Sequence, residues 1–95
     1  MITRIVKLTI DPDSTSKFIR LFEENKDLIV DFEGCQKLSL LQDNKNKNIV
    51  FTYSVWENED ALIKYKNSEL FNTIWSIAKQ TFADRPQAWS LDKVF

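Results

Sequence analysis

The residues in this sequence best suited to holding a small molecule are aromatic, and three of them are tryptophans. Trp56, Trp75 and Trp89 could together form a box around a planar ligand. A tryptophan is more often a core residue whose indole N–H finds a hydrogen-bond partner, and core packing is the favoured interpretation for Trp56 and Trp75. The same side chain can pack in the core and also line a pocket, so pocket lining is the alternative interpretation. Phe71 would extend the same helical face as Trp75.

A smaller set of polar side chains could orient or activate such a ligand. Tyr53 and Tyr65 offer hydroxyls that could orient or deprotonate a phenolic substrate, but an ordinary tyrosine titrates near pKa ~10 and needs a nearby cation to act as a base. Structural hydrogen bonding is the favoured role for both. Arg4 could stabilise a substrate enolate or a peroxide anion, or it could protect the sheet surface or pair across a dimer. Asn67 could bind substrate, although helix capping is the simpler explanation.

The amino-acid composition excludes several kinds of catalytic site. The chain has no histidine, which removes the commonest general base, metal ligand and haem ligand. Its single cysteine, Cys35, cannot form an intrachain disulfide or a multi-cysteine metal site, and we expect it to be a small buried apolar residue. A Ser/His/Asp triad, a histidine-containing zinc site and a histidine proton relay are therefore excluded. We expect a site without a metal or a cofactor.

Charge and hydropathy limit the partners of the chain. Thirteen Lys and Arg residues against fourteen Asp and Glu residues give a net charge of −1, which offers no long-range attraction for nucleic acid or anionic lipid. No stretch approaches the ~20 apolar residues that span a bilayer. The first seven residues hold no apolar run of signal-peptide length. We therefore expect a cytoplasmic protein with a small-molecule partner and no nucleic-acid or membrane partner.

The candidate residues are distributed over four predicted strands and two predicted helical regions. Alternating or continuous apolar runs predict strands over 2–10, 35–42, 49–56 and 88–95. Helical spacing predicts one helix from about 14 to 30 and a second region over 58–82 that is interrupted at 67–68. The order βαββαβ is typical of an α+β, ferredoxin-like fold with a four-stranded antiparallel sheet and helices on one face. Residues 1–95 are expected to form one domain.

Local signals mark where these elements begin and end. Pro12, between two aspartates, stops the first strand, and Ser14 or Asp13 can cap the helix that follows. Gly34 is the only glycine and is expected at positive φ where that helix turns into a strand. The polar run 43–48 predicts a hairpin turn, and Asn58 is a good cap for the second helical region.

The predicted sheet has more apolar surface than its helices can cover. Two helices cover one face of a four-stranded sheet. The third strand is apolar on both faces, with Phe51 and Tyr53 on one and Val50 and Trp56 on the other. The last strand adds Trp89 and further apolar residues. Physical reasoning alone therefore predicts that the second face is buried in a homodimer.

Three short motifs resemble those of the antibiotic biosynthesis monooxygenase (ABM) family. In Val55–Leu62 a tryptophan closes the third strand and an acidic, capped segment starts a helix with Ala-Leu. The segment Tyr65–Phe71 resembles the helix break of the family, and Glu33-Gly34-Cys35 resembles its turn into the second strand. The motifs occur in the right order on the right elements, and the resemblance extends over essentially the whole chain.

The resemblance implies a dimeric α/β barrel with a pocket between each sheet and its helices. Some members oxygenate anthrones, quinols or polyphenols without metal or flavin, because an electron-rich substrate anion can pass an electron to oxygen itself. The prediction is a cofactor-independent monooxygenase acting on such a small aromatic molecule. Its candidate catalytic residues are Tyr65 and Trp75, and its candidate substrate-binding residues are Arg4, Tyr53, Trp56, Asn67, Phe71 and Trp89. The alternative is a non-catalytic dimeric module that binds a small ligand or supports an assembly.

The sequence also departs from the family pattern. Many relatives carry histidine at the positions matched by Tyr65 and Leu70. In the haem-degrading branch a tryptophan and a haem-ligating histidine occupy the positions matched by Tyr65 and Trp75, so haem degradation is not expected here. A βαββαβ order also occurs in RNA-recognition domains, but the third strand lacks their glycine-containing aromatic consensus.

Overall fold

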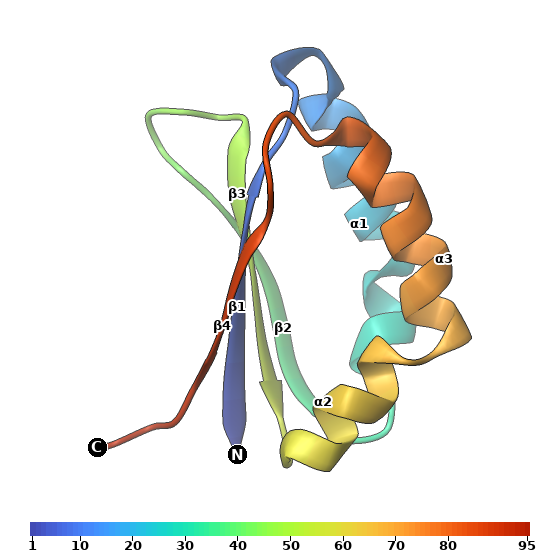
Figure 1. Ribbon diagram of the computed structural model, residues 1–95, viewed down its shortest axis with the longest axis vertical. Helices are drawn as coiled ribbons and strands as arrows, with labels where there is room; N and C mark the ends of the chain where they lie inside the picture. The colour runs from blue at the N-terminus through green and yellow to red at the C-terminus, as the bar shows by residue number, and fades with distance from the viewer.

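A computed structural model describes all residues from 1 to 95 and has one antiparallel sheet with helices packed on one face (Figure 1). The elements are β1 (Ile2–Thr9), the 3₁₀ turn η1 (Pro12–Ser14), α1 (Thr15–Val30), β2 (Cys35–Gln42), β3 (Ile49–Trp56), α2 (Glu59–Lys66), α3 (Glu69–Ala78), the 3₁₀ turn η2 (Lys79–Thr81) and β4 (Gln87–Leu91). The strand order is β2-β3-β1-β4. The α+β, ferredoxin-like prediction is confirmed.

Local residue chemistry sets the turn before β2 and the starts of α2 and α3. Gly34 has φ +89° between α1 and β2, in the region that favours glycine. Asn58 Oδ1 accepts a hydrogen bond from the Ala61 N–H at 2.9 Å and caps α2. Ser68 Oγ accepts from the Phe71 N–H at 3.0 Å and caps α3. The predicted interruption at 67–68 is therefore a break between two capped helices.

The start of α1 differs from the prediction. The Ser14 side chain makes no capping hydrogen bond. The cap lies three residues earlier, where Asp11 Oδ1 accepts from the Asp13 N–H at 2.9 Å and starts η1. Pro12 takes the first position of that turn, where its missing N–H costs no hydrogen bond. The proline thus leads the chain from β1 into α1 through a 3₁₀ turn.

The last strand is shorter than the predicted 88–95. β4 ends at Leu91, which pairs with Thr3 of β1. Because β1 begins at Ile2, hardly any partner backbone is left for the residues after Leu91. Residues 92–95 therefore run away from the sheet, and Phe95 is fully exposed (Figure 1).

The two faces of the sheet have different surroundings. The inner face packs against α1 and α3 through a buried cluster of Leu8, Ile10, Phe18, Val50 and Ala78. On the outer face no helix covers the strands (Figure 1). Ile5 pairs with Tyr53 on one side and Trp89 on the other, so that an apolar row crosses three strands of the outer face. No helix in the structure combines the length and apolar character needed to cross a bilayer.

Candidate functional site

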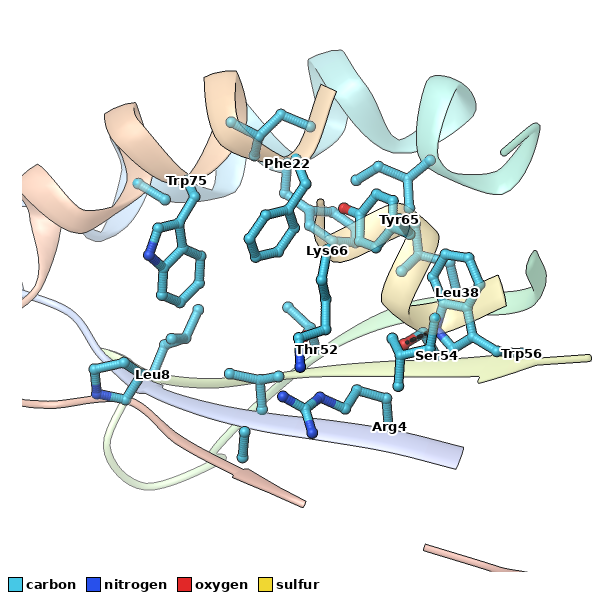
Figure 2. Close-up of a pocket in the computed structure, with 18 of the residues that line it drawn as sticks. Arg4, Leu8, Phe22, Leu38, Thr52, Ser54, Trp56, Tyr65, Lys66 and Trp75 are labelled. Atoms are coloured by element: carbon cyan, nitrogen blue, oxygen red, sulfur yellow. Dashed lines mark hydrogen bonds between the residues drawn. The ribbon is translucent and has the colours of Figure 1, made fainter. Parts of the chain in front are cut away.

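A cavity of about 360 Å³ lies between the inner face of the sheet and the helices. Nineteen residues line it, and fourteen of them are hydrophobic. Figure 2 shows the helices above the cavity and the strands below it, with Trp75 and Leu8 at one end and Trp56 at the other. The size and the apolar lining are those of a site for a small organic molecule.

Aromatic rings from the helices and from the end of β3 form a continuous wall of this cavity. Tyr65 stacks on Trp56 with ring centroids 4.8 Å apart and planes inclined by 25°. Phe71 stacks on Trp75 with centroids 5.5 Å apart and planes inclined by 13°. Tyr65 and Phe71 join the two stacks edge to face at 5.2 Å. Such pairs stabilise one another beyond simple burial and hold the ring planes in fixed directions.

The strand side of the cavity is partly polar because alternate residues of β3 face inward. Thr52, Ser54 and Trp56 all line the cavity. The Trp56 indole is 1% exposed, and its Nε1–H donates to Ser54 Oγ at 2.9 Å. This bond satisfies the only polar atom of the indole and leaves the Ser54 hydroxyl proton free to be donated.

Two cationic side chains line the cavity from opposite layers. Arg4 belongs to β1, and its Nη1 donates to the hydroxyl of Ser90 in β4 at 3.0 Å. Lys66 is the last residue of α2, and its side chain points down toward Thr52 and Arg4 (Figure 2). No aspartate or glutamate is among the lining residues. The one ion pair of the protein joins Lys64 to Glu33, so neither Arg4 nor Lys66 is neutralised by a carboxylate.

Tyr65 supplies the phenol of the cavity, and its environment keeps that phenol protonated. Burial and, to a smaller extent, charge repulsion from the nearby Cys35 together raise its pKa to about 12. The hydroxyl is therefore a neutral hydrogen-bond donor near pH 7. The sequence left open whether Tyr65 orients a substrate or deprotonates it, and this environment favours orientation.

Five of the eight candidate site residues come together at the cavity. Arg4, Trp56, Tyr65, Phe71 and Trp75 all line it.

The structure does not bring the other three to the cavity. Tyr53 lies between Thr52 and Ser54, so strand alternation turns its ring to the outer face. Trp89 pairs with Ile5 on the same outer face and is 43% exposed, so the box of three tryptophans does not form. Asn67 is the exposed C-terminal cap of α2, and its backbone N–H bonds to Ile63 O.

Sequence reasoning missed the polar residues that face the apolar wall. Lys66 follows Leu62 by one helical turn, and Leu62 is buried, so helical periodicity indicates that Lys66 shares the inward face. Thr52 and Ser54 share the parity of Trp56 on β3, and strand alternation places them on the same face. Both signals were present in the sequence once the inward face of each element was known.

Comparison with known proteins connects this arrangement to a family. The sequence pattern of the family described as antibiotic biosynthesis monooxygenase matches residues 1–74. The chain belongs to this family. The recognised resemblance is confirmed, and the matched segment carries every strand and helix around the cavity except the end of α3, η2 and β4.

Several solved structures have the same fold as this chain at low sequence identity. A conserved protein from Methanosarcina mazei superposes with a TM-score of 0.90 at 20% identity, over 98% of this chain and 93% of that chain. A variant of SnoaB, a cofactor-independent oxygenase from Streptomyces nogalater, superposes with a TM-score of 0.88 at 14% identity, over 99% of this chain and 93% of that chain. These likenesses concern the fold.

A relative by sequence is a provisionally named heme-binding protein of Natronomonas pharaonis. It is 27% identical over 79 residues, which are 83% of this chain and 13% of that protein. This chain therefore matches a small part of the length of that relative.

The cavity does not fit a haem group. Its lining contains no histidine, cysteine or methionine, the side chains that most often ligate haem iron. Tyr65 is the one residue in the lining with an oxygen that could ligate as a phenolate, and its pKa of about 12 opposes that form. No group of three or more histidine, cysteine, aspartate or glutamate side chains in the protein is placed to hold a metal ion.

Proposed function

We propose that this ABM-family protein is a cofactor-independent monooxygenase acting on a small aromatic molecule of the quinol, anthrone or polyphenol type. The observation that carries the proposal is the apolar cavity of about 360 Å³ with stacked aromatic rings along its wall. A planar aromatic compound fits such a wall by shape and by ring stacking. The membership of the chain in a monooxygenase family supports the reaction type.

The reaction for an anthrone-type substrate balances with oxygen as the only co-reactant. Two C–H bonds of a methylene carbon break and one C=O bond forms. One oxygen atom enters the product, and the other leaves as water with the two hydrogens. The substrate anion gives the first electron to oxygen, so the protein has to bind, orient and exclude bulk water.

The cavity residues divide these tasks in the proposed mechanism. Trp75 and Phe71 hold the ring plane of the substrate by stacking. Tyr65 donates a hydrogen bond to a substrate oxygen, since its phenol stays protonated. None of the lining residues is a histidine, aspartate or glutamate, so in this mechanism the substrate binds as the anion that it forms in solution, where water accepts its proton.

The proposal includes a homodimer formed through the outer sheet face, in a cytoplasmic protein. The apolar row formed by Tyr53, Ile5 and Trp89 lies on the face that no helix covers (Figure 1). Leu41 and Leu91 add exposed apolar area on the same side, at 52% and 43% exposure. An exposed apolar surface of this kind is typical of a protein–protein interface, and a second copy offers a complementary face.

Oxygen consumption tests the proposed function. Purified protein treated with a metal chelator is assayed with quinols, anthrones and flavonoids against the rate of autoxidation without protein. We expect saturable uptake that falls about tenfold in Tyr65→Phe, the effect of losing one hydrogen bond to an ionised group. Trp75→Ala should raise KM because it removes a stacking surface. Tyr53→Phe is the matched control, because Tyr53 lies on the opposite face of the sheet.

A flat response would support the alternative function. If folded protein consumes no oxygen with any compound of the panel, the monooxygenase proposal is wrong. Binding of the same compounds without turnover would then identify a non-catalytic ligand-binding module. The absence of an acidic residue or a histidine from the cavity lining is the observation that favours this second candidate.

A further inference from the structure

No carboxylate of the protein forms an ion pair with the positive charges at the cavity. Arg4 and Lys66 line the same cavity from opposite layers, and no acidic residue lines it with them. The Arg4 guanidinium has five N–H donors, and one of them, on Nη1, donates to the Ser90 hydroxyl. The other four have no acceptor within the protein. The protein as a whole has a net charge of −1, so this local excess of positive charge runs against the overall balance.

The geometry of the cavity allows these two cations to act on one ligand. Figure 2 shows the Lys66 amine directed toward the sheet and the Arg4 guanidinium beneath it, with Thr52 beside them. Arg4 is held in place by its bond to Ser90 on the neighbouring strand, which reduces the entropy that it loses on binding. The hydroxyls of Thr52 and Ser54 lie on the same strand face and add neutral donors.

We propose that the cavity takes a planar aromatic carboxylate, with its carboxylate group between Arg4 and Lys66 and its ring against the aromatic wall. A carboxylate accepts two parallel hydrogen bonds from a guanidinium and a further one from an ammonium group. The inference rests on the proposed function for its aromatic part and specifies the substrate class within it. A ligand without charge would cover both cations without replacing their contacts with water, which costs binding free energy.

Charge and apolarity are also arranged along the cavity as such a ligand requires. The stacked pair Phe71 and Trp75 lies on α3, while the Lys66 amine is directed toward the sheet that carries Arg4. A flat acid can therefore stack and form its ion pairs in the same pose. The low dielectric of the apolar lining strengthens the attraction between a carboxylate and the cations.

The test uses two probes of the same shape, 2-naphthoate and the neutral 2-naphthamide, measured by isothermal titration calorimetry at neutral pH and low salt. We expect 2-naphthoate to bind at least about tenfold more tightly, the factor expected from one charge-assisted hydrogen bond. Arg4→Gln and Lys66→Gln should each remove most of that preference and leave the affinity for 2-naphthamide nearly unchanged. The preference should also shrink at high salt.

Lys64→Gln is the matched control, because Lys64 lies on the same helix and pairs with Glu33 outside the cavity. This variant should keep the full preference for 2-naphthoate. Lys66 is exposed at a helix end, so Lys66→Gln is expected to fold even if Arg4→Gln does not.

The outcomes separate this inference from the proposed function. Equal binding of the two probes to the unmodified protein would overturn the anion site and leave the aromatic cavity as a binding site. A preference that survives in Lys66→Gln and Arg4→Gln would overturn it as well, because the charge would then act elsewhere. If neither probe binds but a neutral quinol supports oxygen uptake, the inference is wrong and the monooxygenase proposal stands.

Discussion

The ring of Tyr65 stacks on the indole of Trp56, with centroids 4.8 Å apart and planes inclined by 25°. This contact joins the C-terminal part of α2 to the end of β3. Phe32, just after α1, and Phe71 of α3 pack edge to face against Tyr65 at 5.3 and 5.2 Å, so the phenol is surrounded by aromatic groups from three segments. Enclosure of this kind removes water from the hydroxyl and disfavours its ionised form.

The ionisation of Tyr65 can be measured in a protein that has no other tyrosine. Tyr53→Phe leaves Tyr65 as the single tyrosine, and its ionisation appears in the near-ultraviolet absorbance. We expect a midpoint close to pH 12, because burial raises the pKa of Tyr65 to about 12. A midpoint near 10, with the circular dichroism of the folded protein intact, would contradict the enclosed position of the phenol.

The same pKa predicts how stability depends on alkaline pH. Tyr65 titrates near 10 in the unfolded chain and near 12 in the folded protein, so the folded state holds its proton more tightly. Its contribution to the free energy of unfolding is therefore fully present below pH 10 and is lost as pH rises toward 12. Urea unfolding at several alkaline pH values should show a smaller loss of stability in Tyr65→Phe than in the unmodified protein.

Ser54→Ala should destabilise the protein through Trp56. The substitution removes the acceptor of the buried Nε1–H, and leaving such a donor without a partner costs about 1–3 kcal/mol. Thr52→Val is the control on the same strand face, since no hydrogen bond of the Thr52 hydroxyl within the protein is lost, and a change within about 0.5 kcal/mol is expected. Urea unfolding of both variants checks the difference. Equal effects would show that the Trp56–Ser54 bond contributes little.

Gly34→Ala should be strongly destabilising for two independent reasons. A Cβ at this position would overlap the Cβ of Ala61, and the φ of +89° is unfavourable for any residue with a side chain. Strain and overlap together are expected to lower the free energy of unfolding by about 2–5 kcal/mol. Adding Ala61→Gly should relieve the overlap and recover part of the loss, while the backbone strain stays. No recovery in the double variant would contradict the close approach of these two residues.

The proposed dimer predicts different effects for two exposed apolar residues. Trp89→Glu places a charge on the outer sheet face and should dissociate the dimer into monomers, as measured by sedimentation or light scattering. Leu28→Glu is the control, because Leu28 is 56% exposed on α1, away from that face. A monomeric unmodified protein, or equal dissociation in both variants, would argue against the outer face as the interface.

The order and most boundaries of the helices and strands could be predicted from the amino-acid sequence. Caps at Asn58 and Ser68 and the turn at Gly34 act through contacts within a few residues, so their effect can be predicted locally. The absence of histidine excluded whole classes of chemistry regardless of the fold. The end of β4 at Leu91 could not be predicted in this way, because it depends on where its partner strand β1 begins.

Which of the candidate residues share one site depends on the packing of the helices against the sheet. The alternation of side chains along β3 puts Tyr53 and Trp56 on opposite faces of the sheet. Which of the two sets of alternate residues faces the helices depends on how the whole sheet packs. Trp89 joined the outer face through its register with Ile5, a pairing between residues far apart in the chain. That Arg4 and Lys66 line one cavity likewise depends on how α2 packs against the sheet, because contacts between layers are set by packing and not by spacing along the sequence.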